Sequence, residues 1–385
     1  VLDNDQFFEL NHRMYRSMLE GERPLADRMA LFWHGFFPVS REVVRRKYEL
    51  INQFQFFQEN ALGNFETLLR GVAHDPAMLW FLDNDANIKG HPNENYAREL
   101  MELHTLGVDG PWTETDVREV ARALTGWSTD WDASVSETGF LYRDDWHDPD
   151  GKLVLGTVIP AGGGEQDGVA VLQLLANHPA TAAYVSRKLA ERFIGEDPQE
   201  ALVQHLARTW RSTGGDLRAV MRALLLSPQF RLAADDGEPR VKRPLVLMAS
   251  LARALEASGP ELASRIVEDL DLLGEPLYLA RPPTGFPDTS SHWSGNGALL
   301  HRFNIFYATA RGWHGIDFEP VTADDPGSLV DAWLGRLFVR EVPAATRNAA
   351  VDHLNGLPGY VQDDPQRASR EVLAVLLASP EFLSH

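Results

Sequence analysis

The sequence lacks cysteine and lacks long apolar runs. Without cysteine, disulfides, thiolate zinc sites and cysteine nucleophiles are all excluded, while the cellular compartment stays open. No uninterrupted apolar run approaches the roughly 20 residues that cross a bilayer, so we expect no membrane span. The first residues, VLDNDQFFEL, show no basic start followed by an apolar core, and the numbering begins at Val1, so we expect that any signal peptide is absent from this chain.

Basic residues are also scarce relative to acidic ones. The chain has 36 Lys and Arg against 55 Asp and Glu, which gives a formal net charge of −19. Because nucleic-acid binding draws its affinity largely from neutralised phosphates, this balance argues against a nucleic-acid or anionic-membrane partner. With 385 residues, 44% of them hydrophobic, the chain is able to bury a large core.

Helical periodicity dominates the sequence, and prolines mark where helices end and begin. The residue before a proline is pushed out of the helical region, whereas proline itself fits the first helical position. Two such segments, Val220–Phe230 and Val372–Phe382, match closely, but the irregular spacing of all the corners argues against a solenoid. The predicted helix-Pro-helix corners are at Pro76, Pro179, Pro228 and Pro380.

A β-rich segment interrupts the helices at about residues 128–164. Its run GFLYRDDWHDPDGKLVLGTVIP alternates and contains DPDG, so we expect a hairpin with its turn at Asp148–Gly151. The following AGGGEQDG lacks the Gly-Lys-Ser/Thr ending of a phosphate loop, and no organic cofactor is predicted. No long polar linker is evident. Residues 1–385 are therefore predicted to form one multi-helical globular domain, mainly α, with a small β-hairpin insertion.

The polar stretch after Pro92 predicts a helix that starts at the N-cap Asn93 and ends before Gly107. Glu94, Arg98 and Glu102 follow one another at four-residue intervals and therefore share one side of the helix. One interpretation is a simple ladder of ion pairs. The next helix begins with Thr113 and Asp116 in the capping-box relation.

Glu99 on the same helix asks for a separate explanation. It lies between the ladder and the apolar strip and has no cation three or four positions away, so burial would raise its pKa or force it to find a partner. Glu99 and Glu102 are three residues apart and are able to act together on one metal ion or as a carboxylate pair. His104 points about half a turn away, so we predict that His34, on the apolar MALFWHGFF helix, supplies the nearest imidazole.

The loop before this helix matches part of a calcium-loop pattern. Asp83, Asp85, Asn87 and Glu94 occupy its positions 1, 3, 5 and 12, although the sixth position, usually glycine, is Ile88. A divalent cation, with Ca²⁺ the best match, is therefore a predicted cofactor. An Asp/Asn-rich turn whose side chains bond to their own backbone is the alternative.

A family resemblance joins these features. The run PNENYARELMELHTLGVDG followed by ARALTGW, together with FWHGFF, HPATAAYVSRKL and LLLSPQF, resembles the bacterial family catalogued as domain of unknown function 1800. The resemblance covers nearly the whole chain. It implies an exported protein, periplasmic or extracellular, without a settled activity. One departure is Gly285-Phe286-Pro287, where the family usually shows a Gly-Trp-Pro-like segment.

Three functional hypotheses follow. The first is an exported hydrolase that uses Glu99 and Glu102 with His34, or a bound divalent ion, to activate water. Its substrate would be a polymer such as a glycan or a smaller molecule, and Trp127, Phe286 and Trp293 would supply aromatic faces that stack on sugars. The second is a non-catalytic binding or assembly protein, and the third is a calcium-stabilised scaffold. The oligomeric state is left open.

Overall fold

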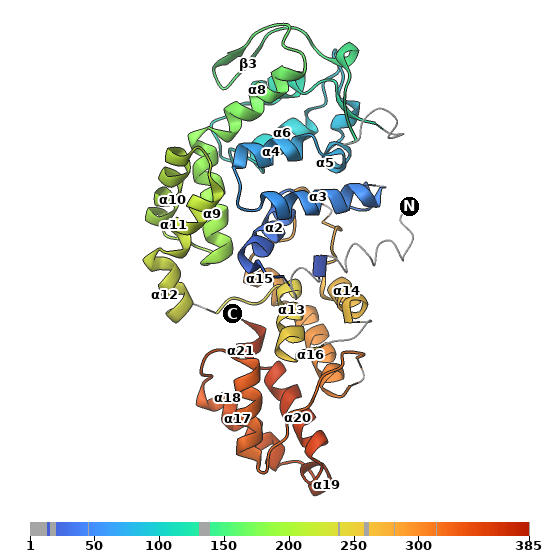
Figure 1. Cartoon of the computed structure of the whole chain (residues 1–385), viewed down its shortest axis with the longest axis vertical. Helices are drawn as coiled ribbons and strands as arrows, with labels where there is room; N and C mark the ends of the chain where they lie inside the picture. The colour runs from blue at the N-terminus through green and yellow to red at the C-terminus, as the bar shows by residue number, and fades with distance from the viewer. Residues whose placement is uncertain are drawn as a thin grey trace. The chain divides into compact units, whose positions relative to one another are not determined.

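The computed structural model describes residues 14–15, 21–44, 46–130, 139–237, 239–257, 262–280, 282–312 and 314–384. Helices make up most of these residues, as predicted (Figure 1). None of the helices in these ranges has the length and apolar character needed to cross a membrane.

The chain divides into two compact units, where the sequence had led us to expect one domain. Among the described residues, unit 1 comprises 22–237 and 278–287, and unit 2 comprises 14–15, 21, 239–277 and 288–384, with the gaps given above. The chain passes from one unit to the other near residues 237, 277 and 287. A division of this kind leaves no long polar linker for a sequence analysis to find.

Unit 1 is built mainly from helices. The helix α10 packs against both α9 and α11, and α3 packs against α2, α4 and α5 (Figure 1). Its helices are α2 (Pro24–Phe36), α3 (Lys47–Asn60), α4 (Phe65–Ala73), α5 (Pro76–Phe81), η1 (Asn84–Ala86), α6 (Glu94–Glu102), α7 (Glu114–Ala123), η2 (Asp144–Trp146), α8 (Glu165–Ala176), α9 (Pro179–Phe193), α10 (Glu200–Thr213), α11 (Leu217–Leu225) and α12 (Pro228–Asp236).

The regular secondary structure of the described part of unit 2 consists of helices joined by loops. The helices α17 and α18 pack against each other, and α20 packs against both of them and against α16. Its helices are α13 (Pro244–Ala254), α14 (Leu262–Leu273), α15 (Ser290–Trp293), α16 (Asn296–Ala310), α17 (Pro326–Leu337), α18 (Ala344–Asn355), α19 (Gly359–Gln362), α20 (Pro365–Leu377) and α21 (Pro380–Leu383).

The four proline corners are confirmed. Each proline is the first residue of a helix, and the side chain of the residue before it accepts a hydrogen bond from a backbone N–H of that helix. In the two matching segments the geometry is the same, since Ser227 accepts from the N–H of Phe230 and Ser379 from the N–H of Phe382. The side chain preceding each proline therefore supplies the hydrogen-bond acceptor that starts the next helix.

The β-rich segment forms two small antiparallel hairpins rather than one. β1 (Trp127–Thr129) pairs with β2 (Phe140–Tyr142), and β3 (Lys152–Val154) pairs with β4 (Thr157–Ile159). Residues 131–138 of the predicted insertion lie outside the described residues.

The predicted turn at Asp148–Gly151 is wrong. The tight turn between β3 and β4 is Leu155–Gly156, with φ of 49° and 75° at its two residues. Two successive positive φ angles match the right-handed twist of a two-residue hairpin. Asp148 instead binds Arg122 of α7 and accepts from the N–H of Asp150, so DPDG forms a local turn before β3.

Candidate functional site

The predicted ladder on α6 is confirmed as a set of ion pairs. Arg98 lies 3.5 Å from both Glu94 and Glu102, one turn to either side of it. It also donates to both carboxylate oxygens of Glu114 on α7, at 2.6 and 3.0 Å. Glu102 is therefore engaged in a structural contact between α6 and α7.

Glu99 remains the unusual residue of this helix. Its side chain is half-buried and makes no hydrogen bond or ion pair with any residue in the described ranges. Burial and the neighbouring charge of Glu102 raise the pKa of the Glu99 carboxyl. A catalytic role for Glu99 stays a prediction.

Two residues of the predicted calcium loop are committed to other partners. The buried Asn87 amide donates to Asn84 and to the Ala121 carbonyl, and its oxygen accepts from the N–H of Asn93 at 2.9 Å. Glu94 faces Arg98 and Arg118. These contacts favour a turn held by its own hydrogen bonds.

The remaining pair is Asp83 and Asp85. Burial, and to a lesser extent the charge of Asp83, raises the pKa of the Asp85 carboxyl. Across the described ranges, no three His, Asp or Glu side chains gather in a way that would hold a metal ion. Calcium binding by Asp83, Asp85, Asn87 and Glu94 stays a prediction.

The aromatic residues proposed to stack on sugars are mostly enclosed. Trp127 is 0% exposed and packs against the rings of His74 and Phe140, and Trp293, in unit 2, is 2% exposed. A sugar needs an open ring face to stack on, and neither indole offers one. Phe286 is half-buried.

The two histidines considered for catalysis have different surroundings. His104 is fully buried beside Phe36 and Phe37, its ring nitrogens have no hydrogen-bond partner among the described residues, and burial lowers its pKa to about 3. His34, on α2, packs edge-on against Tyr278 with ring centroids 4.5 Å apart. The contact with Tyr278 places His34 beside a group of polar side chains that the sequence analysis did not single out.

That group is the Asp75 cluster, which we define as Glu49, Gln53, Asp75, Tyr96 and Tyr278. Glu49 and Gln53 are four residues apart and therefore face the same side of α3, which packs against α5. Asp75 is the N-cap of α5, and its Oδ1 accepts from the N–H of Ala77 at 3.0 Å. Its Oδ2 accepts from Nε2 of Gln53 at 2.6 Å.

Tyr278 comes from a segment more than 200 residues away in the chain. Its carbonyl accepts from the N–H of Arg41 at 2.8 Å, and its hydroxyl donates to the carbonyl of Leu50 at 3.4 Å. The same segment approaches α2 at Gly285, where φ is 69° and a Cβ would lie 2.3 Å from the carbonyl oxygen of Gly35. Only glycine fits this approach, which helps hold Tyr278 in place.

The electrostatics of the cluster centre on Asp75. Burial raises the pKa of the half-buried Asp75 carboxyl to about 7, against the opposing effect of its hydrogen bonds from Gln53 and Ala77. Burial also raises the pKa of Glu49, while Arg46, 3.6 Å away, lowers it. Burial, and to a lesser extent the charge of Asp75, raises the pKa of the Tyr278 hydroxyl. A carboxyl that titrates near neutral pH is suited to proton transfer.

Gln53 is able to serve both protonation states of Asp75. Its Nε2 donates to the carboxylate, while its Oε1 is buried and has no hydrogen-bond partner in the part of the chain that the structure describes. The two ends of a glutamine amide have nearly the same shape. Rotating the amide by half a turn brings Oε1 to the position from which it accepts the O–H of a protonated Asp75.

Sequence reasoning missed this cluster for a physical reason. The motif His74-Asp75-Pro76 marks a helix start, and an N-cap aspartate is usually exposed and structural. Nothing local in the sequence shows that α3 and the Tyr278 segment enclose this N-cap. The one signal was the spacing of Glu49 and Gln53, which are four residues apart and therefore lie on one side of the helix.

Comparison with known proteins places the whole chain in one family. The model of the family described as a protein of unknown function, DUF1800, matches residues 2–384. The chain belongs to the DUF1800 family. No curated protein matches it. No solved structure matches it either.

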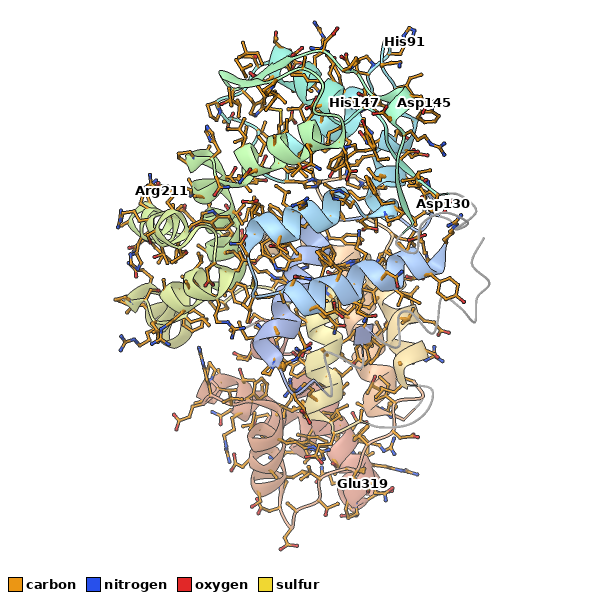
Figure 2. The ribbon with its side chains drawn as sticks, turned by 45° about the horizontal axis from the view of Figure 1, so that its top comes forward. His91, Asp130, Asp145, His147, Arg211 and Glu319 are labelled. Atoms are coloured by element: carbon orange, nitrogen blue, oxygen red, sulfur yellow. The ribbon has the colours of Figure 1, made fainter. Side chains whose placement is uncertain are left out.

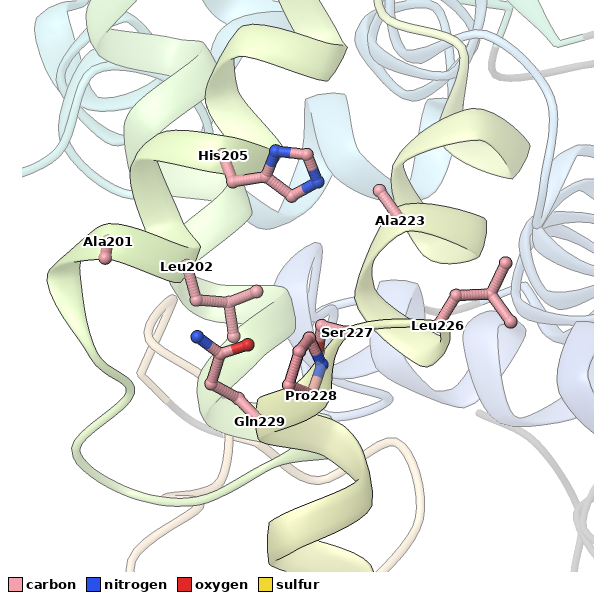
Figure 3. Close-up of a pocket in the computed structure, with 8 residues that line it drawn as sticks. All are labelled: Ala201, Leu202, His205, Ala223, Leu226, Ser227, Pro228 and Gln229. Carbon is pink, nitrogen blue, oxygen red and sulfur yellow. The ribbon is translucent and has the colours of Figure 1, made fainter.

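This DUF1800 chain also has a cleft of about 380 Å³ between α10, α11 and α12 (Figure 3). His205 extends from α10 toward Ala223 of α11, and both are close to the corner that starts α12 (Figure 3). The hydroxyl of Ser227 accepts from the N–H of Phe230 at 3.1 Å, so it serves as a helix cap. The cleft is lined by Ala201, Leu202, His205, Ala223, Leu226, Ser227, Pro228 and Gln229, none of them a carboxylate.

A second buried polar group lies in the β-rich part of the DUF1800 chain. Lys152 donates to Oδ2 of Asp167 and to the carbonyl of Asp148, both at 2.5 Å, and Nε2 of His147 (Figure 2) is 3.2 Å from the same Asp167 oxygen. His147 Nδ1 lies 2.8 Å from the carbonyl of Thr125. All three side chains are 2–3% exposed. They fasten β3 to the first turn of α8, and we assign them a structural role.

Proposed function

We propose that this DUF1800 protein is a carboxylate-dependent hydrolase in which Asp75 is the general acid. The observation that carries the proposal is the Asp75 carboxyl, which is half-buried, has a pKa of about 7 and lies beside a second carboxyl of raised pKa. General acids and bases work best when their pKa is close to the operating pH. Among the candidate residues, Asp75 meets this condition best.

The proposed reaction divides two proton transfers between two carboxyls. Protonated Asp75 gives its proton to the oxygen of the leaving group as the scissile bond breaks. Glu49, whose ionised form Arg46 favours at 3.6 Å, takes a proton from the attacking water. Gln53 turns its amide as Asp75 changes protonation state. The water proton thus ends on Glu49 and the Asp75 proton on the leaving group.

An extracellular polymer such as a glycan is the substrate class that we place first. Glycoside hydrolysis uses a protonated carboxyl together with an ionised one, which is the division of roles proposed for Asp75 and Glu49. Export is part of the proposal because the family resemblance implies it. Glu99, another carboxyl of raised pKa without an ion pair in the described ranges, is the alternative acid, and Glu102 and His34 keep their predicted roles beside it.

The exchange Asp75→Asn tests the proposal. Asparagine is as good an N-cap as aspartate, so α5 keeps its start, whereas the amide has no proton to give. The full chain and the variant are assayed on polysaccharides, nitrophenyl glycosides and nitrophenyl esters. We expect kcat/KM to fall by roughly 10²- to 10⁴-fold on any substrate that the parent hydrolyses.

The matched control is Asp216→Asn. Asp216 caps α11 by accepting from the N–H of Ala219 at 3.0 Å, but it is exposed and lies outside the Asp75 cluster. This variant should keep parental rates. The proposal fails if the parent hydrolyses none of these substrate classes, or if Asp75→Asn turns over a parental substrate at the parental rate.

A further inference from the structure

Unit 2 encloses an arginine that makes no ion pair with any carboxylate of the described residues. Arg302 of α16 is 0% exposed. Its Nη2 donates to the carbonyl of Lys242 at 3.0 Å, while its Nε and Nη1 have no acceptor among the described residues. Arginine keeps its charge in proteins, and burial of a charge is unfavourable unless its donors find acceptors.

The acidic side chains of this region make their direct contacts with Arg243. Glu275 acts on Arg302 only through its charge. One of its oxygens accepts from Arg243 and the other accepts from the N–H of Leu245 at 2.9 Å. Arg243 also binds Asp288, so both acids are in contact with Arg243, and Arg302 has no ion pair with any carboxylate of the described residues.

A second cation lies close by on the same backbone segment. Lys242, whose carbonyl receives the Arg302 hydrogen bond, donates from Nζ to the carbonyl of Phe382 at 2.7 Å and lies over the Phe382 ring. Burial lowers the pKa of Lys242 to about 8. No carboxylate within the described residues pairs with Lys242, so this region has three cations, Arg243, Lys242 and Arg302, against the two carboxylates Glu275 and Asp288.

We infer that Arg302 binds a small anion, a halide or a small carboxylate such as formate, inside unit 2. The free guanidinium donors supply directed hydrogen bonds, and the enclosed position strengthens their attraction for a negative charge. Complete burial of the side chain limits the ligand to a few atoms. This site is separate from the Asp75 cluster and does not depend on the proposed hydrolase activity.

The test measures thermal unfolding of the full chain in sodium chloride and in sodium gluconate at equal ionic strength. Chloride fits an enclosed site, whereas gluconate is too large. A ligand that binds only the folded state raises Tm with the logarithm of its concentration. We expect a rise of roughly 2 to 5 °C per tenfold increase in chloride above its dissociation constant, and none in gluconate.

Arg302→Met removes the buried charge and should make Tm independent of the anion. The matched control is Arg336→Met on α17, because all three guanidinium nitrogens of Arg336 donate hydrogen bonds to backbone carbonyls, those of Ala254, Leu255 and Glu319. This control should keep the parental response to chloride. Equal Tm in the two salts for the parent, or the same chloride response in Arg302→Met, would overturn the inference.

A second measurement needs no variant. Crystals of the parent protein grown in bromide should show an anomalous peak within hydrogen-bonding distance of the Arg302 guanidinium. Ordered bromide elsewhere with none at Arg302 would contradict the site, even if Arg302→Met failed to fold.

Discussion

At the scale of single residues, the chain places ionisable groups where water does not reach them well. Asp75 shows the consequence for a carboxyl, whose pKa rises to about 7, and His104 shows it for an imidazole, whose pKa falls to about 3. The two shifts have one cause, since burial disfavours the charged form of either group. The two residues differ in their access to solvent. Asp75 is half-buried and able to exchange a proton, while His104 is fully buried beside aromatic rings.

His104 should make the fold sensitive to acid. Between about pH 6.5 and pH 3 the His104 imidazole is protonated in the unfolded chain and neutral in the folded chain. The free energy of unfolding therefore falls as the pH falls through this range. We predict that His104→Leu removes this contribution. When the pH is lowered from 7 to 5, the free energy of unfolding should fall by roughly 2 kcal/mol less in the variant than in the parent.

Urea unfolding of the parent and the variant between pH 4 and pH 8 measures this difference. His205→Leu is the control, because the His205 ring is exposed to solvent and its exchange should leave the pH dependence as in the parent. Identical pH dependence in the parent and His104→Leu would show that the buried imidazole contributes nothing.

At the scale of helices and strands, helix caps could be predicted from the sequence, whereas contacts between elements distant in the chain could not. Asn93 caps α6, and Thr113 and Asp116 form the capping box of α7, as the sequence indicated. These features depend on residues within one turn of each other. The turn at Asp148–Gly151 was misplaced because the partner of Asp148 is Arg122 on α7, which a local pattern does not reveal.

The same distinction applies to the candidate site. The ladder around Arg98 follows from helical spacing and was predictable, although its bond to Glu114 on the next helix was not. Glu99 was correctly singled out as a carboxyl whose pKa would be raised. The Asp75 cluster is assembled by tertiary packing from segments up to 229 residues apart, Glu49 to Tyr278. The spacing of residues close together in the sequence therefore does not predict it.

The buried contact between Lys152 of β3 and Asp167 of α8 should contribute to the stability of the fold. Lys152→Met leaves the buried Asp167 carboxylate without its cation, and we expect the free energy of unfolding to drop by about 3–5 kcal/mol. The double variant Lys152→Met with Asp167→Asn removes both charges and lets the amide donate to His147. It should recover a large part of that loss.

Urea unfolding of the two variants and the parent gives the comparison. The exposed pair Arg347–Asp331 is the control, since solvent screens this ion pair and Arg347→Met should leave the free energy of unfolding nearly unchanged. A double variant as unstable as Lys152→Met alone would show that the loss comes from packing and not from the uncompensated charge.

At the scale of the whole molecule, the two compact units carry different chemistry. The Asp75 cluster belongs to unit 1, and the enclosed cations Arg302 and Lys242 belong to unit 2. The family match spans residues 2–384, so both units belong to what the DUF1800 family shares. The net charge of −19 disfavours polyanionic partners over most of the surface, whereas an enclosed arginine is still able to hold a single small anion.

The proposed role of Asp75 as general acid requires that its carboxyl holds a proton near neutral pH. The direct measurement is a carboxyl ¹³C NMR titration of protein labelled at aspartate Cγ, with Asp75→Asn used to assign the signal. We predict a midpoint near pH 7 for Asp75. A midpoint at or below about 4, the ordinary value for aspartate, would mean that Asp75 is ionised at neutral pH and would remove it as the general acid.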